Sequence, residues 1–271
     1  MFRKKNTPNH APSWHKTARV LQYDNIVSEL MECVMRKLKG SSGYLRNQTI
    51  KNLAKAALSL LIFLVILLAL TLRVFSTLQV GLLEEVAAVL SLVPLGVFYF
   101  YLRKYRIYNG GLQGERQVAK LLTSSLGDEF FLINDLYLRN GGGDIDHIVL
   151  GPNGVFVLET KNWSGNITCN GDEWGRLGKR VFSSGPSRQV KRNAGKIKQV
   201  IDNSHVLGSG VWVEGIVVFT NKHATLHLNN PTVQVLKLPQ LPNCLASYRG
   251  SRVYSRQELE VIGKEIIKQK H

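Results

Sequence analysis

The chain reads DHIVLGPNGVFVLETK from residue 146 to residue 161. Its two apolar segments are separated by Gly-Pro-Asn-Gly, a combination typical of a tight turn between strands. Both segments are nearly continuous in Ile, Val, Leu and Phe, which indicates strands that are covered on both faces of a sheet. The stretch therefore predicts a pair of buried antiparallel strands with charged residues at one end.

Three charged residues lie at that end, because Asp146 begins the first strand and Glu159 and Lys161 end the second. Side chains alternate between the faces of a strand, so Glu159 and Lys161 project to the same side, and an antiparallel register brings Asp146 beside them. Two acids and a lysine at the edge of a buried sheet form a site for a divalent metal, with a cation for a phosphate or a water molecule. A structural ion pair is the alternative, because Glu and Lys two residues apart commonly pair at a surface.

The surrounding motifs extend this pattern. Residues 111–115 read GLQGE and open an amphipathic run that Gly127 closes, which places Glu115 in the first turn of a helix. A polar, Gly-containing hairpin follows residue 162, PSRQV at 186–190 leads a second helix, and an apolar strand covers 215–219. The series G-x-x-G-E, IDHIVLGPNGVFVLE-x-KN and P-x-x-Q-V resembles the nuclease-related domain (NERD) family of the PD-(D/E)xK restriction-endonuclease-like superfamily, over about residues 111–225.

This resemblance implies an α/β fold with a restriction-endonuclease-like α-β-β-β-α-β core and a site made of Glu115, Asp146, Glu159, Lys161 and Gln189. Carboxylates are hard oxygen ligands, so Asp146 and Glu159 are the expected ligands of Mg²⁺ or Mn²⁺, joined by the Thr160 carbonyl. Glu115 is expected as an outer ligand or a ligand of a second metal. The alternative for Glu115 is an acid that favours the N-terminal dipole of its helix.

The other polar residues near the strands have roles of their own. Lys161 is expected to hold or help deprotonate the attacking water and to offset charge in the transition state. Gln189 is expected to orient substrate or water, unless it only caps its helix or faces solvent. His147 points away from Asp146, so we expect it to pack or form a hydrogen bond rather than bind metal. Asp144 shares the face of Asp146 and is an alternative ligand.

Two apolar runs precede this region, at residues 56–72 and 86–102, each seventeen residues long and without a charge. They are at the short end of the length that spans a bilayer. Aromatic residues gather at the end of the second run, where an interfacial belt would lie. The runs predict a transmembrane helical hairpin, and a buried helical hairpin of a soluble protein is the alternative.

The charge distribution orients this hairpin. Residues 1–55 carry +8, the segment 73–85 carries −1, and the chain from Arg103 onward carries +9 of the total of +16. Basic residues stay on the cytoplasmic side, so a multi-pass protein of the cytoplasmic (inner) membrane is expected, with both termini and the nuclease-like domain in the cytosol. A basic cytosolic domain binds nucleic acid or lies against anionic lipid, and charge alone leaves both open.

Four regions follow from these patterns: a basic N-terminal region at 1–55, the hairpin at 56–102, the nuclease-like domain at 103–225 and its C-terminal extension at 226–271. Within the first region, 1–19 has the composition of a disordered segment, and 20–38 has helical apolar spacing. The extension is expected to add a strand at 231–238 and a helix that opens at Ser255 with a capping box.

Other chemistries lack support in the sequence. Three scattered cysteines form neither a zinc pattern nor a disulfide framework, in keeping with a reducing compartment. The chain contains no P-loop, dinucleotide motif or internal repeat. The leading hypothesis is therefore metal-dependent phosphodiester hydrolysis, with DNA as the expected substrate. The alternatives are an inactive nuclease fold that binds nucleic acid or protein at the membrane, and a scaffold whose basic surface holds anionic lipid.

Overall fold

A computed structural model describes residues 43–77, 81–138, 144–177, 185–205 and 211–269. The predicted disordered segment at 1–19 and the predicted amphipathic helix at 20–38 lie outside these residues. Within them the chain is a mixed α/β protein, as expected, with a pair of long helices followed by a sheet.

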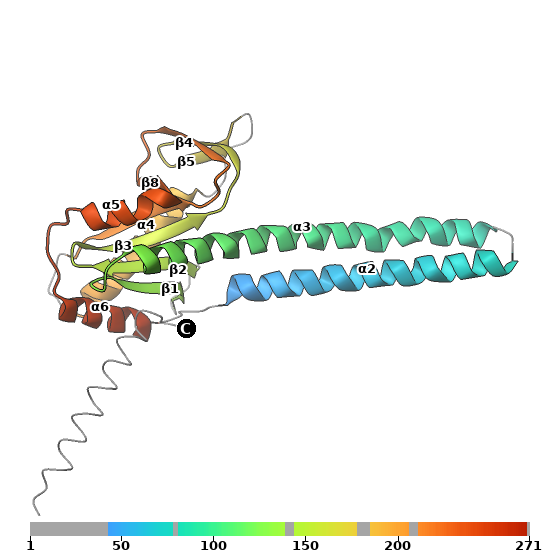
Figure 1. Cartoon of the computed structure of the whole chain (residues 1–271), viewed down its shortest axis with the longest axis horizontal. Coiled ribbons are helices and arrows are strands. Elements are labelled where there is room, and N and C mark those ends of the chain that lie inside the picture. The colour runs from blue at the N-terminus through green and yellow to red at the C-terminus, as the bar shows by residue number, and fades with distance from the viewer. Residues whose placement is uncertain (1–42, 78–80, 139–143, 178–184, 206–210, 270–271) are drawn as a thin grey trace, which may run out of the picture. The chain divides into compact units, whose positions relative to one another are not determined.

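The two long helices are α2 (Tyr44–Thr77) and α3 (Leu82–Ser125), which lie side by side along the apolar segments (Figure 1). Both are long and apolar enough to cross a membrane by length and composition, and only 6% of each apolar segment is buried. Pro94 lies inside α3, a position tolerated in apolar helices whose neighbours satisfy the freed backbone groups. Arg73, near the end of α2, pairs with Glu84, in the first turn of α3, at 2.7 Å.

The expected helix start at Gly111 is wrong. Helix α3 continues without interruption through Gly110 and Gly111 to Ser125, so Glu115 lies in its interior and the helix-dipole explanation for this acid does not apply. Glycine costs a helix about 1 kcal/mol relative to alanine. The helix is tied to the sheet at this point, since Asn162 Nδ2 donates a hydrogen bond of 2.7 Å to the Gly110 carbonyl. The boundary expected at residues 102 and 103 therefore lies inside one helix.

The main sheet has five strands in the order β1-β2-β3-β6-β8. The first three strands are antiparallel, and β6 and β8 add in parallel. Element order from α3 to β6 follows the expected α-β-β-β-α-β series, with one inserted hairpin. The bounds are β1 Phe131–Tyr137, β2 Asp144–Gly151, β3 Gly154–Lys161, β6 Val213–Phe219 and β8 Gln234–Lys237.

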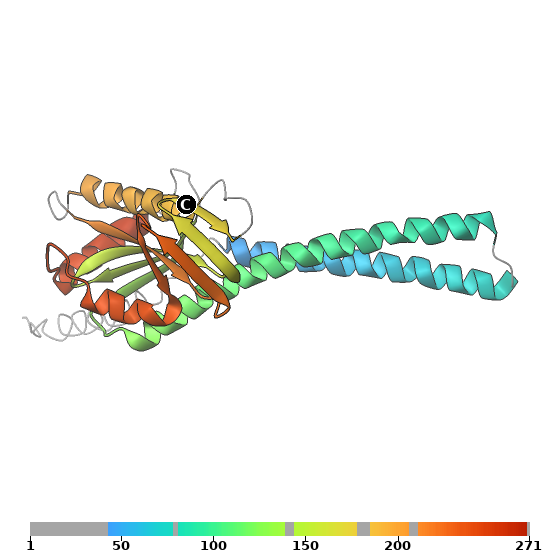
Figure 2. The same ribbon diagram turned by 90° about the horizontal axis from the view of Figure 1, so that it is seen from above.

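Helices cover both faces of this sheet, which Figure 2 shows from above. On one face, Val118 and Leu122 of α3 pack with Phe156 and Leu158 of β3, and α5 (Leu241–Ser247) completes that layer. Helices α4 (Pro186–Asn203) and α6 (Arg256–Lys268) cover the other face. Burial on both sides explains the apolar runs of β2 at residues 148–150 and of β3 at residues 155–158.

A smaller sheet of order β5-β4-β7 lies beside the main sheet (Figure 1). The expected polar hairpin forms its first two strands, β4 (Gly165–Asn170) and β5 (Glu173–Arg176). The third, β7 (Ala224–Asn229), was not predicted. The strand expected at 231–238 is the short β8, and Ser255 caps α6 with Glu258 as the capping box predicts.

Candidate active site

The end of the β2–β3 pair brings the predicted acids together. His147 is paired with Leu158 in the antiparallel ladder. Just beyond this pair, the Thr160 backbone N–H donates a hydrogen bond of 2.6 Å to Asp146 Oδ2. Asp146 therefore lies beside the Glu159–Thr160 segment, as the sequence predicted.

Lys161 lies on the same side of β3 as Glu159, also as predicted. Its Nζ is 2.5 Å from Glu159 Oε1 and donates a second hydrogen bond of 3.3 Å to Gln189 Oε1 on α4. Glu159 is only 2% exposed, and its other oxygen, Oε2, has no hydrogen-bond partner among the described residues. Gln189 thus touches the candidate site through Lys161 instead of capping α4 or pointing to solvent.

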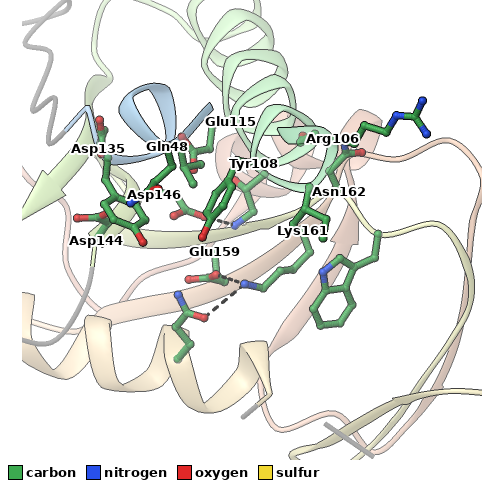
Figure 3. Close-up of a pocket in the computed structure, with 18 of the residues that line it drawn as sticks. Gln48, Arg106, Tyr108, Glu115, Asp135, Asp144, Asp146, Glu159, Lys161 and Asn162 are labelled. Carbon is green, nitrogen blue, oxygen red and sulfur yellow. Dashed lines mark hydrogen bonds and ion pairs between the residues drawn. The ribbon is translucent and has the colours of Figure 1, made fainter. Parts of the chain in front are cut away.

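Helix α3 reaches the site through Gly114. A Cβ atom at Gly114 would lie 2.8 Å from Thr220 Oγ1 and 3.2 Å from Asn162 Cβ, so only glycine lets α3 pass the ends of β3 and β6 this closely. Glu115 follows at once and points into the same cleft as Asp146 and Glu159 (Figure 3).

The cleft around these residues has a volume of about 1310 Å³. The ends of β1, β2 and β3 contribute its acidic side. The first turns of α2 and residues 106–108, 110 and 111 of α3 contribute the opposite side. The α2 contribution was not anticipated, because nothing in its local sequence indicates which residues it will face.

Asp135 of β1 is an acidic residue of the cleft that the sequence did not single out. The pairs on either side of it, Asn134 with His147 and Leu136 with Ile145, place it opposite Asp146. Its φ is +52°, a left-handed conformation that non-glycine residues seldom adopt within a strand. Its Oδ2 accepts a hydrogen bond of 3.1 Å from the Gly43 backbone N–H. In the sequence, Asp135 stands out as one acid in a largely apolar strand. Such an acid can be assigned to a site only when the pairing register of the strand is known.

The acids of the cleft disfavour one another's ionised forms. Burial and the neighbouring Glu159 and Glu115 raise the pKa of Asp146 well above its ordinary value. Burial, and then Asp135 and the other carboxylates, raise the pKa of Glu115 to about 8. Burial also raises the pKa of Glu159, although Lys161 partly opposes the shift. When these acids are ionised, their negative charge exceeds the positive charge of Lys161, so the cluster has a deficit of positive charge.

A divalent cation fits that deficit. It would neutralise the acids, and the buried Glu159 Oε2, which has no hydrogen-bond partner in the described part of the chain, would be available to it as an oxygen ligand. No group of three or more His, Cys, Asp and Glu side chains in the described ranges is arranged to hold a metal. Ligation would therefore use Asp146, Glu159 and the Thr160 carbonyl, with water completing the shell, as is common for Mg²⁺.

His147 and Asp144 have different places. His147 is buried on the opposite face from Asp146, and its Nδ1 is 2.7 Å from Asn134 Oδ1. Burial lowers its pKa to about 3, so this histidine is neutral and hydrogen-bonded, as the sequence predicted. Asp144 lies at the rim of the cleft, near enough to raise the pKa of Glu115.

The raised pKa of Glu115 predicts a pH-dependent stability. Between its ordinary value of 4.5 and about 8, the folded protein binds more protons at this site than the unfolded chain. Stability without metal should therefore fall as pH rises through this interval. Melting temperatures of the full-length protein in EDTA at pH 5.5 and pH 8 test this, and Glu115→Gln should flatten the dependence. A melting temperature that rises toward pH 8 equally in both proteins would contradict it.

Residues 110–220 match the family model of the nuclease-related domain, NERD. An uncharacterized protein of Bacillus anthracis is 32% identical over 90 residues, which cover 32% of this chain and 41% of that protein. The match thus spans about two fifths of that relative's length. No solved structure matches the chain significantly. The matched domain contains every predicted site residue from Glu115 to Gln189, and the NERD resemblance seen in the sequence is confirmed.

Proposed function

We propose that this protein is a membrane-anchored, metal-dependent nuclease of the restriction-endonuclease-like type, with DNA as the expected substrate. The observation that carries the proposal is the convergence of Glu115, Asp146, Glu159 and Lys161 in one cleft of a domain that matches a nuclease-related family. One buried and two half-buried acids that repel one another around a single lysine are costly in a purely structural cluster, which supports a functional site.

The residues divide the chemistry among them. Bound Mg²⁺ or Mn²⁺ would polarise the scissile phosphate and lower the pKa of the attacking water. Asp146 and Glu159 would hold it, and the hydrogen bond from the Thr160 N–H fixes the Asp146 carboxylate in position. Lys161, held between Glu159 and Gln189, directs its ammonium group toward charge that develops on the phosphate.

The anchor is proposed from the exposed surface of the two long helices. Their apolar segments are almost entirely uncovered by the described residues. Side chains such as Leu68, Leu72 and Leu90 are exposed in both helices. Apolar surface of this extent is not maintained in water, whereas an apolar helix with its backbone fully hydrogen-bonded is stable in a bilayer.

The proposed orientation predicts a labelling pattern. Single cysteines at Lys51 and Lys104 should react only after the membrane is opened, whereas a cysteine at Ser76 should react from outside intact cells, because the basic flanks stay in the cytosol. Extraction at alkaline pH should leave the full-length protein in the membrane. Labelling of the two basic flanks in intact cells, or release by alkaline wash, would contradict the anchored topology.

One observation favours a second candidate, a domain that binds nucleic acid or protein without cutting it. Lys161 already has Glu159 and Gln189 as partners, and this arrangement also fits a structural ion pair. Cleavage of DNA by the full-length protein in detergent, with Mg²⁺ or Mn²⁺ against EDTA, separates the two candidates. Metal-dependent products support the nuclease, and binding without products supports the second candidate.

The basic charge of the domain leaves two anionic partners to compare, nucleic acid and anionic lipid. Nucleic-acid binding should weaken steeply with salt, because each phosphate contact releases counterions. Lipid binding weakens with salt as well, so the deciding comparison is mixed-sequence DNA against liposomes with anionic headgroups at one low salt concentration. We expect the protein to bind the DNA more tightly than the liposomes. Binding to liposomes alone would favour the scaffold hypothesis.

A further inference from the structure

The helical hairpin supplies one wall of the candidate active site. Tyr44, Gln48 and Lys51 of α2 and Arg106 and Tyr108 of α3 line the cleft opposite the acidic strand ends. The rings of Tyr44 and Tyr108 meet edge to face with centroids 6.4 Å apart. In Figure 3, Gln48 and Tyr108 lie on the side of the cleft that faces Asp146 and Glu159. A domain cut at residue 103 would lack the α2 part of this wall.

The wall and the floor of the cleft combine aromatic rings with cations. Tyr44 is 47% exposed, and Tyr108, Tyr137 and Trp163 are partly exposed along the same cleft. Lys161 Nζ lies 5.8 Å from the centre of the Trp163 ring, so one aromatic surface adjoins the candidate catalytic lysine.

The cations lie around these rings. Lys51 and Arg106 are exposed on the helical wall. Arg176, at the end of β5, also lines the cleft, and its buried Nε has no hydrogen-bond partner among the described residues. A buried guanidinium nitrogen without a partner is costly unless an anion completes its bonding.

From this arrangement we infer that the cleft is a groove for single-stranded nucleic acid, built jointly by the hairpin and the nuclease-like domain. Tyr108 and Trp163 stack unpaired bases, and Lys51, Arg106 and Arg176 bind the backbone phosphates. A combination of aromatic and basic side chains is typical of single-strand grooves, whereas in a duplex the faces of the bases are already covered by their neighbours. The inference rests on the proposed function, which supplies nucleic acid as the substrate. It adds that this nucleic acid is single-stranded.

The position of the groove has a physical consequence. At 1.5 Å per residue, Lys51 lies about 7.5 Å from the start of the apolar run at residue 56, and Tyr108 about 9 Å from the end of the run at residue 102. The substrate would thus be bound directly beside the proposed membrane surface, and the helices that anchor the protein form part of the binding site.

Binding can be measured apart from cleavage. Full-length protein in nanodiscs of neutral lipid is titrated, in EDTA, into a labelled 15-nucleotide strand and into the duplex of the same sequence. We expect the single strand to bind at least about tenfold more tightly. Tyr108→Leu should weaken single-strand binding about tenfold, the effect of one lost stacking contact. Lys51→Gln and Arg106→Gln should each lower the salt dependence of binding.

Each variant has a matched control on the same helix. Tyr105→Leu, Lys55→Gln and Arg103→Gln change residues of the same type that do not line the cleft, and they should leave both affinities unchanged. Melting temperatures identify any variant that fails to fold. Lys51 and Arg106 are exposed, so their substitutions still test the groove if Tyr108→Leu does not fold.

Equal or tighter binding of the duplex, or equal effects of Tyr108→Leu and Tyr105→Leu, would overturn this inference. Metal-dependent cleavage by the wild-type protein is then recorded on both substrates. If the wild-type protein cleaves the duplex and Tyr108→Leu does not weaken binding, the single-strand groove is overturned and the nuclease proposal stands. The absence of both binding and cleavage in the wild-type protein overturns the nuclease proposal together with it.

Discussion

We expect Asp146→Asn and Glu159→Gln each to abolish metal-dependent cleavage without lowering the melting temperature of the metal-free protein. Asparagine keeps an oxygen that accepts the Thr160 hydrogen bond, and glutamine keeps one for Lys161, so the local geometry survives. Each change removes a negative charge that burial and neighbouring acids disfavour. Alanine at Asp146 is a poorer test, because it would leave the Thr160 N–H unpaired at a cost of about 1–3 kcal/mol.

Lys161→Met should give a different result. It removes only the charge, so turnover should fall by ~10²–10³, the range for losing one electrostatic contact in a transition state. It also leaves the 2% exposed Glu159 without its cation, so the metal-free melting temperature should fall and added Mn²⁺ should restore much of it. Lys268→Met, which breaks an exposed pair with Glu265 on α6, is the control and should change neither quantity.

Melting curves and cleavage rates of these four variants separate the two views of the cluster. If the cluster is only a structural ion pair, Asp146→Asn and Glu159→Gln should destabilise the domain, and no protein should show a metal-induced shift. That outcome would favour the binding role over catalysis.

Gly114→Ala should impair both folding and cleavage. The added Cβ would lie 2.8 Å from Thr220 Oγ1 and against Asn162, so α3 must move away from the ends of β3 and β6 and carry Glu115 with it. Forcing an extra carbon into a packed contact costs about 1–3 kcal/mol. We therefore expect a lower melting temperature together with a loss of cleavage.

Gly195→Ala is the matched control for this change. Gly195 lies in α4, and a Cβ there would meet nothing within 4 Å. Alanine at such a position in a helix stabilises a protein by about 0.4–1 kcal/mol. Chemical denaturation of both variants measures the difference, and equal stability of the two would mean that α3 does not need the close approach at Gly114.

The parts of the fold that could be predicted are those with local signals. The turn at residues 151–154 and its two apolar strands followed from composition, and the register then placed Asp146 near Glu159. The cap at Ser255 followed from its spacing to Glu258. In each case the residues that determine the structure are close in sequence, so their pattern is sufficient.

The features that were missed depend on distant contacts. Helix α3 continues through Gly110 and Gly111, where Asn162 donates a hydrogen bond to the Gly110 carbonyl and Leu45 lies beside Gly111, and such contacts with distant residues override the local propensity of adjacent glycines to end a helix. Strand β7 is mostly exposed and pairs with β4 across more than fifty residues, so it has no apolar run of its own. The place of Asp135 became meaningful only through its register opposite Asp146.

The most direct test of the account is the rate of cleavage of single-stranded DNA by full-length wild-type protein and by Asp146→Asn, each with Mn²⁺ and with EDTA. We expect products only for the wild-type protein with metal, accompanied by a metal-induced rise of its melting temperature that Asp146→Asn lacks. Equal products from both proteins would show that this cluster is not the catalytic site. No products and no metal-induced shift for the wild-type protein, on DNA and RNA alike, would contradict the nuclease assignment.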